Sequence, residues 1–270
     1  MIENTRGSVA LNIASGSSVS LTVENCTFIN NTAGAIGIER EEFAQENALK
    51  VYNSTFISNN RSKGGAIYTQ LAYSIIDSCK FINNTADNGG AIYNLYGAMD
   101  VINSTFQNNS AVERGGSIFI NSSSENTALK ENLFENSNAD MGGAIYSNGL
   151  TELVDNRMTS RSAAIGSYIY NDNRVGHTYV IVMDNRTVTM KRGGTIELYA
   201  YVCDDMKNPI TGGNVTFKIN NVLYNASALE GHARVNCTLD IYGTYAVEGN
   251  YTGSRRYVTQ SSNAQLIIQR

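Results

Sequence analysis

Apolar and polar positions recur along the first 170 or so residues with a spacing of 24 to 28 residues. Each repeat has a large apolar anchor, an apolar residue five positions before it and, in most repeats, an Asn three positions after it. Four repeats then continue with a Gly-Gly pair and a short apolar run. The anchors are Phe28, Phe56, Phe81, Phe106, Phe134 and, in a degraded repeat, Met158. Self-similarity at this period is typical of a solenoid, in which each repeat packs only against its neighbours.

The short apolar runs predict strands, because a helical repeat would need two segments with apolar residues every three or four positions. We therefore predict an all-β chain in which residues 1–172 form a right-handed parallel β-helix of about six coils. Equivalent residues of successive coils would then stack about 4.8 Å apart. The Gly-Gly pairs are predicted corners, since glycine adopts positive φ and allows close backbone approach. An acidic insertion at 38–50 is expected to form a loop or a short helical turn.

From about residue 178 the pattern changes to short runs of alternating apolar residues separated by turn residues. Seven or eight such runs in about ninety residues predict an immunoglobulin-like (Ig-like) sandwich over residues 173–270. The chain has no Trp, so Phe217, Tyr245 or aliphatic residues must fill the centre of that core. The predicted strands are 178–183, 186–190, 195–203, 214–219, 222–226, 232–239, 243–251 and 264–269.

Composition excludes several function classes. A net charge of −4 and a pI near 5.3 argue against a nucleic-acid surface. The chain has no nucleotide-binding motif, and neither His177 nor His232 has a partner at ligand spacing, so we expect no cofactor and no metal. No segment is apolar enough to span a bilayer, and the first twenty residues lack the usual export signal. The chain is then a fragment, or is exported by another route, or remains inside the cell.

Thirteen asparagines lie in N-x-[ST] sequons, a density that suits a glycosylated exterior protein. The alternative is that coil turns favour Asn, Ser and Thr, so that sequons arise by chance. The preferred glycosylation candidates are Asn53, Asn103, Asn121, Asn185, Asn225 and Asn250.

The four cysteines are not expected to form two disulfides. Cys26 and Cys79 share an offset two coils apart, which places them beyond disulfide reach. In the second unit, strand alternation turns Cys203 outward, whereas Cys237 shares the parity of Val235 and Leu239. A Cys203–Cys237 bridge is the less favoured of the two outcomes there.

Two stretches, FISNNRSKGGAIY at 56–68 and FINNTADNGGAIY at 81–93, carry a family resemblance. They resemble the repeats of chlamydial polymorphic outer-membrane proteins and, still more, the β-helical region of adhesin-like surface proteins of methanogenic archaea. The segments at 204–224 and 243–264 resemble the Ig-like repeats that follow such β-helices. The first repeat departs from the pattern, with AGAIGIE at 33–39. The resemblance implies a cell-surface role in adhesion to other cells or extracellular polymers, and fixes no binding residue.

Parallel β-helices also host polysaccharide lyases and hydrolases, which need carboxylates gathered on one face. The best available pair is Glu131 and Asp155, which share an offset on adjacent coils, with Arg157 and Arg161 nearby. A solvated end of the solenoid explains that pair better, because no base or metal-ligand set accompanies it. No catalytic residue is therefore assigned.

One aromatic follows the Ile that recurs in each apolar run, and we predict that these aromatic residues form a ladder. If the isoleucines point inward, strict alternation turns the aromatics outward, where an exposed strip could stack on sugar rings or on a protein partner. The competing interpretation places the aromatics inward. The predicted strip consists of Tyr68, Tyr93, Phe119, Tyr146 and Tyr170.

The sequence thus predicts a non-enzymatic, extracellular cell-surface adhesin or adhesin fragment. Its expected partners are surface glycans or proteins of other cells, or a cell-wall polymer. A β-helix carbohydrate-active enzyme and a ligand-free structural stalk remain as alternatives.

Overall fold

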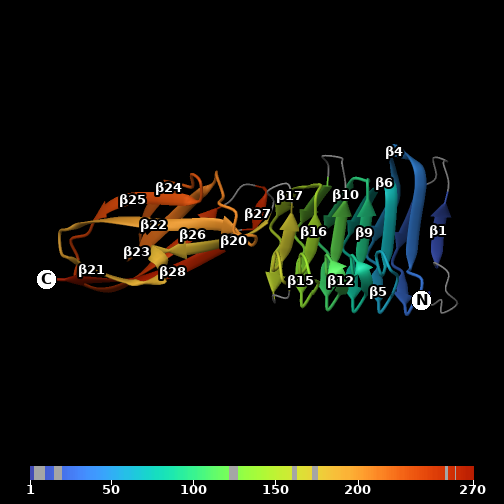
Figure 1. The fold of residues 1–270 in the computed structure, drawn as a ribbon, viewed down its shortest axis with the longest axis horizontal. Helices are drawn as coiled ribbons and strands as arrows, with labels where there is room; N and C mark the ends of the chain where they lie inside the picture. The colour runs from blue at the N-terminus through green and yellow to red at the C-terminus, as the bar shows by residue number, and fades with distance from the viewer. Residues whose placement is uncertain are drawn as a thin grey trace. The chain divides into compact units, whose positions relative to one another are not determined.

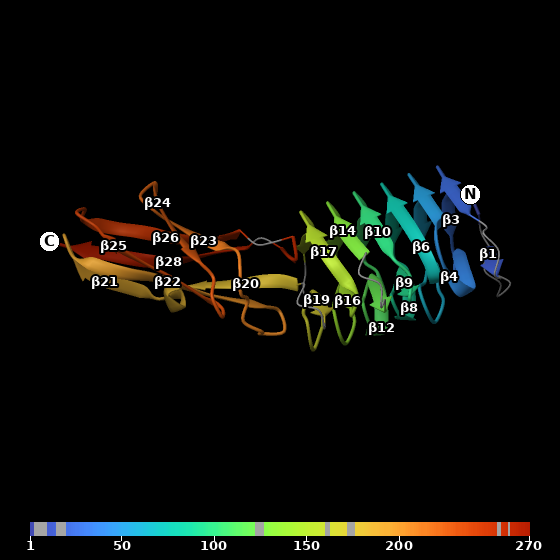
Figure 2. The same ribbon diagram turned by 90° about the horizontal axis from the view of Figure 1, so that it is seen from above.

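The computed structural model describes residues 1–2, 10–14, 20–121, 127–159, 163–171, 176–252, 255–258 and 260–270. The chain divides into two compact units, Met1–Gly176 and His177–Arg270. In the described parts of both units the regular structure consists of strands and one short turn of 3-10 type (Figures 1 and 2).

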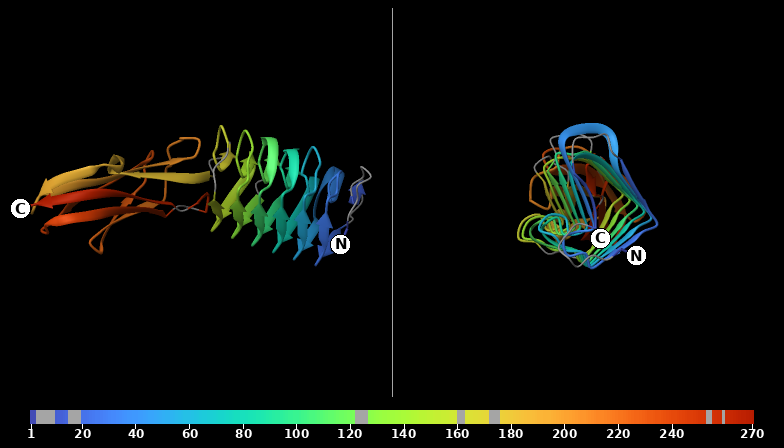
Figure 3. Two further views of the ribbon diagram at one scale, coloured as in Figure 1. Left: turned by 90° about the horizontal axis from the view of Figure 1, so that it is seen from below. Right: turned by 90° about the vertical axis from the view of Figure 1, so that its right-hand side faces the viewer.

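The first unit is a parallel β-helix whose coils stack on one another, as the end-on view in Figure 3 shows. One six-stranded sheet runs in the order β18-β15-β11-β7-β5-β3, and a two-stranded sheet pairs β12 with β8. The largest sheet has eleven strands, with a main path β17-β14-β10-β6-β9-β13-β16-β19 and with β1, β2 and β4 beside it.

The strands of this unit are mostly three to five residues long, as the apolar runs predicted. Those of the six-stranded sheet are β3 (Thr27–Ile29), β5 (Thr55–Ile57), β7 (Lys80–Ile82), β11 (Thr105–Gln107), β15 (Leu133–Glu135) and β18 (Arg157–Thr159). Those of the two-stranded sheet are β8 (Thr85–Asn88) and β12 (Ser110–Arg114). Those of the largest sheet are β1 (Leu11–Ala14), β2 (Leu21–Glu24), β4 (Ile36–Tyr52), β6 (Ile67–Asp77), β9 (Ile92–Leu95), β10 (Met99–Ile102), β13 (Ile118–Asn121), β14 (Thr127–Lys130), β16 (Ile145–Ser147), β17 (Leu150–Val154) and β19 (Ile169–Asn171).

The predicted register is confirmed at the anchors. Phe28 pairs with Phe56, Phe56 with Phe81, Phe81 with Phe106, and so on to Met158. Successive Phe rings stack with centroids 4.7 to 5.0 Å apart and planes within 10° of parallel. The five rings are at most 1% exposed, so the solenoid interior holds a continuous aromatic column.

An Asn ladder lies beside the Phe column. Asn31, Asn59, Asn84 and Asn109 are fully buried, and the Nδ2 of each of the first three donates to the Oδ1 of the next at 2.7 to 3.0 Å. The backbone N–H of each also donates to that same oxygen. Buried amides are tolerated here because each coil satisfies its neighbour.

The Gly-Gly pairs act as predicted, with a different role for each glycine. The first of each pair has positive φ, as at Gly64 and Gly89, both at 65°. The second lies against the next coil: a Cβ on Gly90 would meet the carbonyl oxygen of Gly116 at 2.1 Å. The pair therefore makes a left-handed corner and then permits contact between two backbones.

The insertion at 38–50 does not form the expected helical turn or loop. It continues a single strand, β4, of 17 residues, which pairs in parallel with β6 through three register irregularities. Bulges of this kind let a strand absorb extra residues while its ladder continues. In Figure 3 this strand, in blue, extends past the outline of the later coils.

The second unit consists of two sheets that enclose one core, and is therefore a β-sandwich. One sheet has the order β25-β22-β20-β27 and the other β21-β28-β26-β23-β24. Both contribute to the same apolar cluster, with Leu198 and Val202 from the first sheet and Phe217 and Leu266 from the second. Phe217 fills the core as predicted, but the second large aromatic is Tyr251, which is fully buried, rather than Tyr245.

The predicted strands of this unit lie within a few residues of those observed, apart from the last, which begins four residues earlier. Short β27 was missed. The observed elements are β20 (Gly176–Val182), η1 (Met183–Asn185), β21 (Thr187–Lys191), β22 (Thr195–Asp204), β23 (Asn214–Ile219), β24 (Val222–Ser227), β25 (His232–Thr238), β26 (Gly243–Thr252), β27 (Tyr257–Val258) and β28 (Gln260–Gln269).

Candidate functional site

The aromatic ladder forms with the predicted membership. Tyr68, Tyr93, Phe119, Tyr146 and Tyr170 stack in that order with ring centroids 4.4 to 5.5 Å apart. The isoleucines before them, such as Ile67 and Ile92, are fully buried, so the isoleucines do point inward.

The predicted exposure of this ladder is wrong for its first three rings. Tyr68 and Tyr93 are 7% exposed and Phe119 is 4% exposed. The rings are covered by cations from the neighbouring loops: the Arg61 guanidinium lies 4.7 Å from the Tyr68 ring and the Lys63 amine 5.6 Å from the Tyr93 ring. Burial accordingly raises the pKa of both tyrosines. Strand alternation correctly predicted the direction of these side chains, but it did not predict that loop residues would cover them.

The other two members of the ladder, Tyr146 and Tyr170, remain partly exposed. The Arg114 guanidinium lies 5.4 Å from the Tyr146 ring. Any ligand that stacks on this ladder therefore has only its last two rings available, which is a much smaller platform than the five-ring strip predicted.

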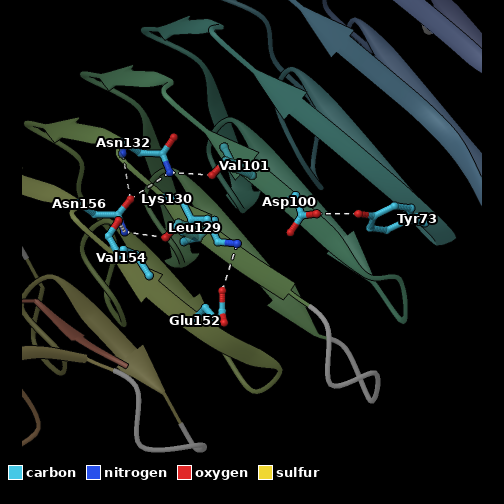
Figure 4. A network of polar contacts seen from close by, with 9 residues as sticks. All are labelled: Tyr73, Asp100, Val101, Leu129, Lys130, Asn132, Glu152, Val154 and Asn156. Carbon is cyan, nitrogen blue, oxygen red and sulfur yellow. Dashed lines mark hydrogen bonds and ion pairs between the residues drawn. The ribbon is translucent and has the colours of Figure 1, made fainter. Parts of the chain in front are cut away.

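A different set of side chains gathers on the outer surface of β6, β10, β14 and β17. The inward residues of these strands, Ile76, Val101, Leu129 and Leu153, are at most 1% exposed, so the residues beside them point outward. We call this surface the polar face. It carries Tyr73, Asp77, Asp100, Lys130 and Glu152, four of which Figure 4 shows.

Two contacts organise the polar face. The Tyr73 hydroxyl donates to Asp100 Oδ2 at 2.6 Å, and Lys130 Nζ lies 3.1 Å from Glu152 Oε2 (Figure 4). Burial, and then the hydrogen bond to Asp100, raises the pKa of Tyr73 to about 12. The Tyr73 phenol therefore stays protonated at neutral pH and is a donor, not a base.

The charges on this face are mixed. With Lys50 of neighbouring β4, which pairs with Ile75, the face has three carboxylates and two amines. It is therefore not the cationic groove that an anionic polysaccharide would favour. Aliphatic residues alternate with the charges, since Ile102 pairs with Asp77 on one side and with Lys130 on the other.

Sequence reasoning missed the polar face although its signal was present. Asp100 and Glu152 both lie six residues before their anchors, and Asp77 and Lys130 lie four before theirs. Offsets that differ by two share one face of a strand, so these acids are gathered rather than scattered.

The favoured carboxylate pair lies elsewhere. Glu131 and Asp155 are exposed corner residues with φ of 58° and 52°, and Arg157 beside them is also exposed. Arg161 falls outside the described residues. The pair marks an outer corner of the coils, where solvent screens the charges.

Six of the eight sequon asparagines in the β-helix have a conformational explanation. Asn25, Asn53 and Asn103 occupy the corner before the Phe strand and Asn30, Asn83 and Asn108 the corner after it, and all six have positive φ between 47° and 56°. Asparagine tolerates this region better than other residues with a Cβ. Of the six preferred candidates, Asn53, Asn103, Asn185 and Asn225 are exposed, and Asn121 and Asn250 are partly exposed.

All four cysteines are free. Cys237 pairs with Ile196, and Cys203 lies seven residues further along that strand, roughly 23 Å away, which is beyond disulfide reach. Cys203 lies outside the core cluster that contains Cys237, in agreement with the predicted outward direction, but it is only 6% exposed, so its thiol is covered.

Asp204 is explained by local structure, because it accepts hydrogen bonds from the backbone of Met206 and Asn208 and from the Asn208 side chain. These contacts close a turn. Among the described residues, no group of three or more His, Cys, Asp or Glu side chains is arranged to hold a metal ion. In the same part of the chain, no helix has the length and apolar character to cross a bilayer.

A family model described as "Right handed beta helix region" matches residues 2–158. No curated protein and no solved structure matches this chain. The matched segment ends at the last Phe-column rung and covers more than half of the chain, and it agrees with the stacked parallel strands described above. The chain therefore belongs to the family of proteins that contain a right-handed β-helix region.

Proposed function

We propose that this chain is a non-catalytic, extracellular adhesin or adhesin fragment that attaches a cell surface to glycans or proteins of other cells or to a cell-wall polymer. The resemblance to adhesin-like surface proteins of methanogenic archaea supports this role, and so does the β-sandwich beside the β-helix, to which we assign an Ig-like identity as part of this proposal. The β-helix family itself includes adhesins and carbohydrate-active enzymes, so the choice between them depends on the outer surface.

The observation that carries the proposal is the polar face. Phe and Asn columns fill the solenoid interior, so recognition has to use an outer surface. The polar face presents a phenol, carboxylates and an amine across four adjacent strands, at the regular spacing of the coils. Such a flat array of hydrogen-bonding groups and aliphatic residues suits lateral attachment to an extended polymer.

One observation favours an enzyme as a second candidate. Asp77 pairs with Ile102, so Asp77 and Asp100 lie on adjacent strands two residues out of register. Their Cα atoms are therefore about 8 Å apart on one face, a spacing that allows the carboxyl separation of about 6.5 to 9.5 Å used by inverting glycosidases.

A binding screen with product analysis separates these roles. The full chain is applied to arrayed glycans and to whole cells, and bound oligosaccharides are recovered and sized. Adhesion predicts binding with intact sugars, and Asp100→Asn should weaken binding at least about fivefold because it removes the charged acceptor of the Tyr73 phenol. Glu135→Gln, on the outer surface of β15, is the matched control and should bind normally.

The other outcomes are equally decisive. Cleaved products that disappear in both Asp77→Asn and Asp100→Asn would establish the enzyme. Absence of binding and of cleavage on every surface tested would leave the ligand-free stalk and overturn the adhesive role.

A further inference from the structure

The outer surface of the four-stranded sheet of the second unit carries a second, independent cluster of side chains. Leu198, Ala200 and Val202 of β22 are fully buried in the sandwich core. Alternation therefore places Tyr199 and Tyr201 on the outer surface, and both rings are partly exposed. Tyr199 pairs with Arg234 on edge strand β25, so the cluster spans two adjacent strands.

Polar groups hold Tyr199 in place. Its hydroxyl donates a short hydrogen bond to Asp184 Oδ2. The Arg234 guanidinium lies 6.0 Å from the Tyr199 ring, and its Nη1 is 2.8 Å from Glu197 Oε2. The hydrogen bond to Asp184 is the main cause of a raised pKa of Tyr199, so the phenol stays neutral at physiological pH.

The segment that supplies Asp184 has an unusual backbone. Met183, Asp184 and Asn185 have φ of 45°, 54° and 53°, three consecutive residues with a side chain in the left-handed region. Met183 anchors the turn in the core at 2% exposure, and Ser262 Oγ donates to Asn185 Oδ1 at 3.1 Å. Backbone strain of this kind concentrates at functional sites. Here the turn places a carboxylate against the ring of Tyr199.

We propose that Tyr199, with Asp184, Glu197 and Arg234, forms a binding site for a neutral pyranose of a surface glycan. The carbon face of a pyranose can stack on the part of the Tyr199 ring that is not packed against the sandwich core, and its hydroxyls can pair with the carboxylates and guanidinium groups.

The charges of the cluster favour a neutral ligand. Arg186 also lies near the Tyr199 phenol, so with Arg234 two guanidinium groups face the carboxylates of Asp184 and Glu197. A charged ligand would gain no net electrostatic attraction from these balanced charges, whereas a neutral ligand that binds by hydrogen bonds does not depend on such attraction. The site lies outside the polar face, so it deepens the proposed adhesive function by naming a ligand class while standing on separate residues.

The test is titration of the full chain with neutral oligosaccharides, and with sulfated and uronic-acid counterparts, followed by calorimetry and by NMR of the sugar. Tyr199→Ala should lower the affinity for neutral sugars at least about tenfold, since an aromatic stacking partner is lost. Tyr199→Phe keeps the ring and loses only the bond to Asp184, so its loss should be smaller. Tyr242→Ala is the matched control, because Tyr242 is 56% exposed with the Arg270 guanidinium 5.3 Å from its ring.

Three results would overturn the site: no binding of any neutral sugar, equal losses in Tyr199→Ala and Tyr242→Ala, or a preference for the anionic sugars. If Tyr199→Ala does not fold, Arg234→Gln, whose parent side chain is exposed, replaces it and should weaken binding at least threefold. Cell attachment measured in parallel separates the two proposals. Attachment that Asp100→Asn abolishes, in a chain that binds no neutral sugar, refutes this site alone, whereas neutral-sugar binding that Tyr199→Ala weakens, without any cell attachment, refutes the adhesive function alone.

Discussion

The two units bury their side chains by different rules. In the β-helix, interior positions of successive coils form columns, several of them of like residues, so Phe56 contacts Phe28 and Phe81 in the same stacked geometry. In the sandwich each core residue is unique, and Phe217 packs among aliphatic residues that come from both sheets. The first core is assembled from contacts between neighbouring repeats, and the second from contacts between strands far apart in sequence.

This difference determines which polar groups each core accepts. The β-helix buries an Asn column because the same amide recurs at the next coil, whereas the sandwich core is apolar apart from groups such as the Tyr251 hydroxyl, which donates to Gly212 O at 3.1 Å. Repetition thus replaces shape complementarity as the source of specificity. Substitutions that act on a column should affect neighbouring coils, and those in the sandwich should affect the whole unit.

The largest expected effect comes from Gly90→Ala. A Cβ there would meet the backbone oxygens of Gly116 at 2.1 Å and Ser110 at 2.6 Å, neither of which can move without breaking its ladder. We expect a loss of at least about 4 kcal/mol in the free energy of unfolding, or failure to fold. In the sandwich, Gly193→Ala meets nothing within 4 Å and should cost only about 1 kcal/mol, because φ there is +71°. Urea unfolding followed by circular dichroism measures both, and equal losses would contradict the close coil contact.

Phe81→Ala should cost about 3 to 5 kcal/mol, since a fully buried ring leaves a cavity between two others. Phe217→Ala, in the sandwich, should cost a similar amount. The two variants should differ in how far the loss of protection spreads. Hydrogen exchange should rise mainly in the coils of Phe56 and Phe106 for the first variant, and across the second unit for the other. Exchange that rises uniformly through the β-helix after Phe81→Ala would refute the nearest-neighbour picture.

How far the sequence predicts this structure depends on whether a feature repeats. The Phe column and the glycine corners each recur at a fixed offset, so the period alone determined their register. The strands of the sandwich were located from alternation and turn residues, both of which are local signals.

Features that depend on one particular neighbour were not predictable. Burial of Tyr68 results from Arg61 in a loop of its own coil, and the extended course of 38–50 results from pairing with β6. Tyr251 was overlooked because its hydroxyl bonds to a backbone oxygen 39 residues away. The polar face was predictable in principle. Its prediction required the recognition that residues four and six positions before the anchors, on different coils, point to the same side of the sheet.

The Asn column gives the next largest effect. Asn84→Ala leaves the backbone N–H and the Nδ2 of Asn59 without their acceptor, in a fully buried position. We expect a cost of about 2 to 4 kcal/mol, as for two unsatisfied buried donors. Asn31→Ala is the matched control, because within the described residues nothing donates to Asn31 Oδ1. It should cost at least about 1 kcal/mol less, and thermal melts that place the two variants together would argue against a chain of dependent amides.

The smallest expected effect concerns Cys79 and tests whether water is excluded from the interior of the β-helix around this thiol. Burial raises the pKa of the Cys79 thiol from 9.0 to about 11. The folded chain therefore keeps this proton between pH 9 and 11 while the unfolded chain releases it, so stability is intact below pH 9 and falls as pH rises through that window. At pH 10 the loss in the free energy of unfolding should be about 1.4 kcal/mol relative to neutral pH, and Cys79→Ser should lessen this loss.

Thiol reactivity at neutral pH checks the same burial. Cys26 lies in the same column but is partly exposed, so it should react with a thiol reagent before Cys79. Equal reaction rates would show that water reaches Cys79 as easily as it reaches Cys26.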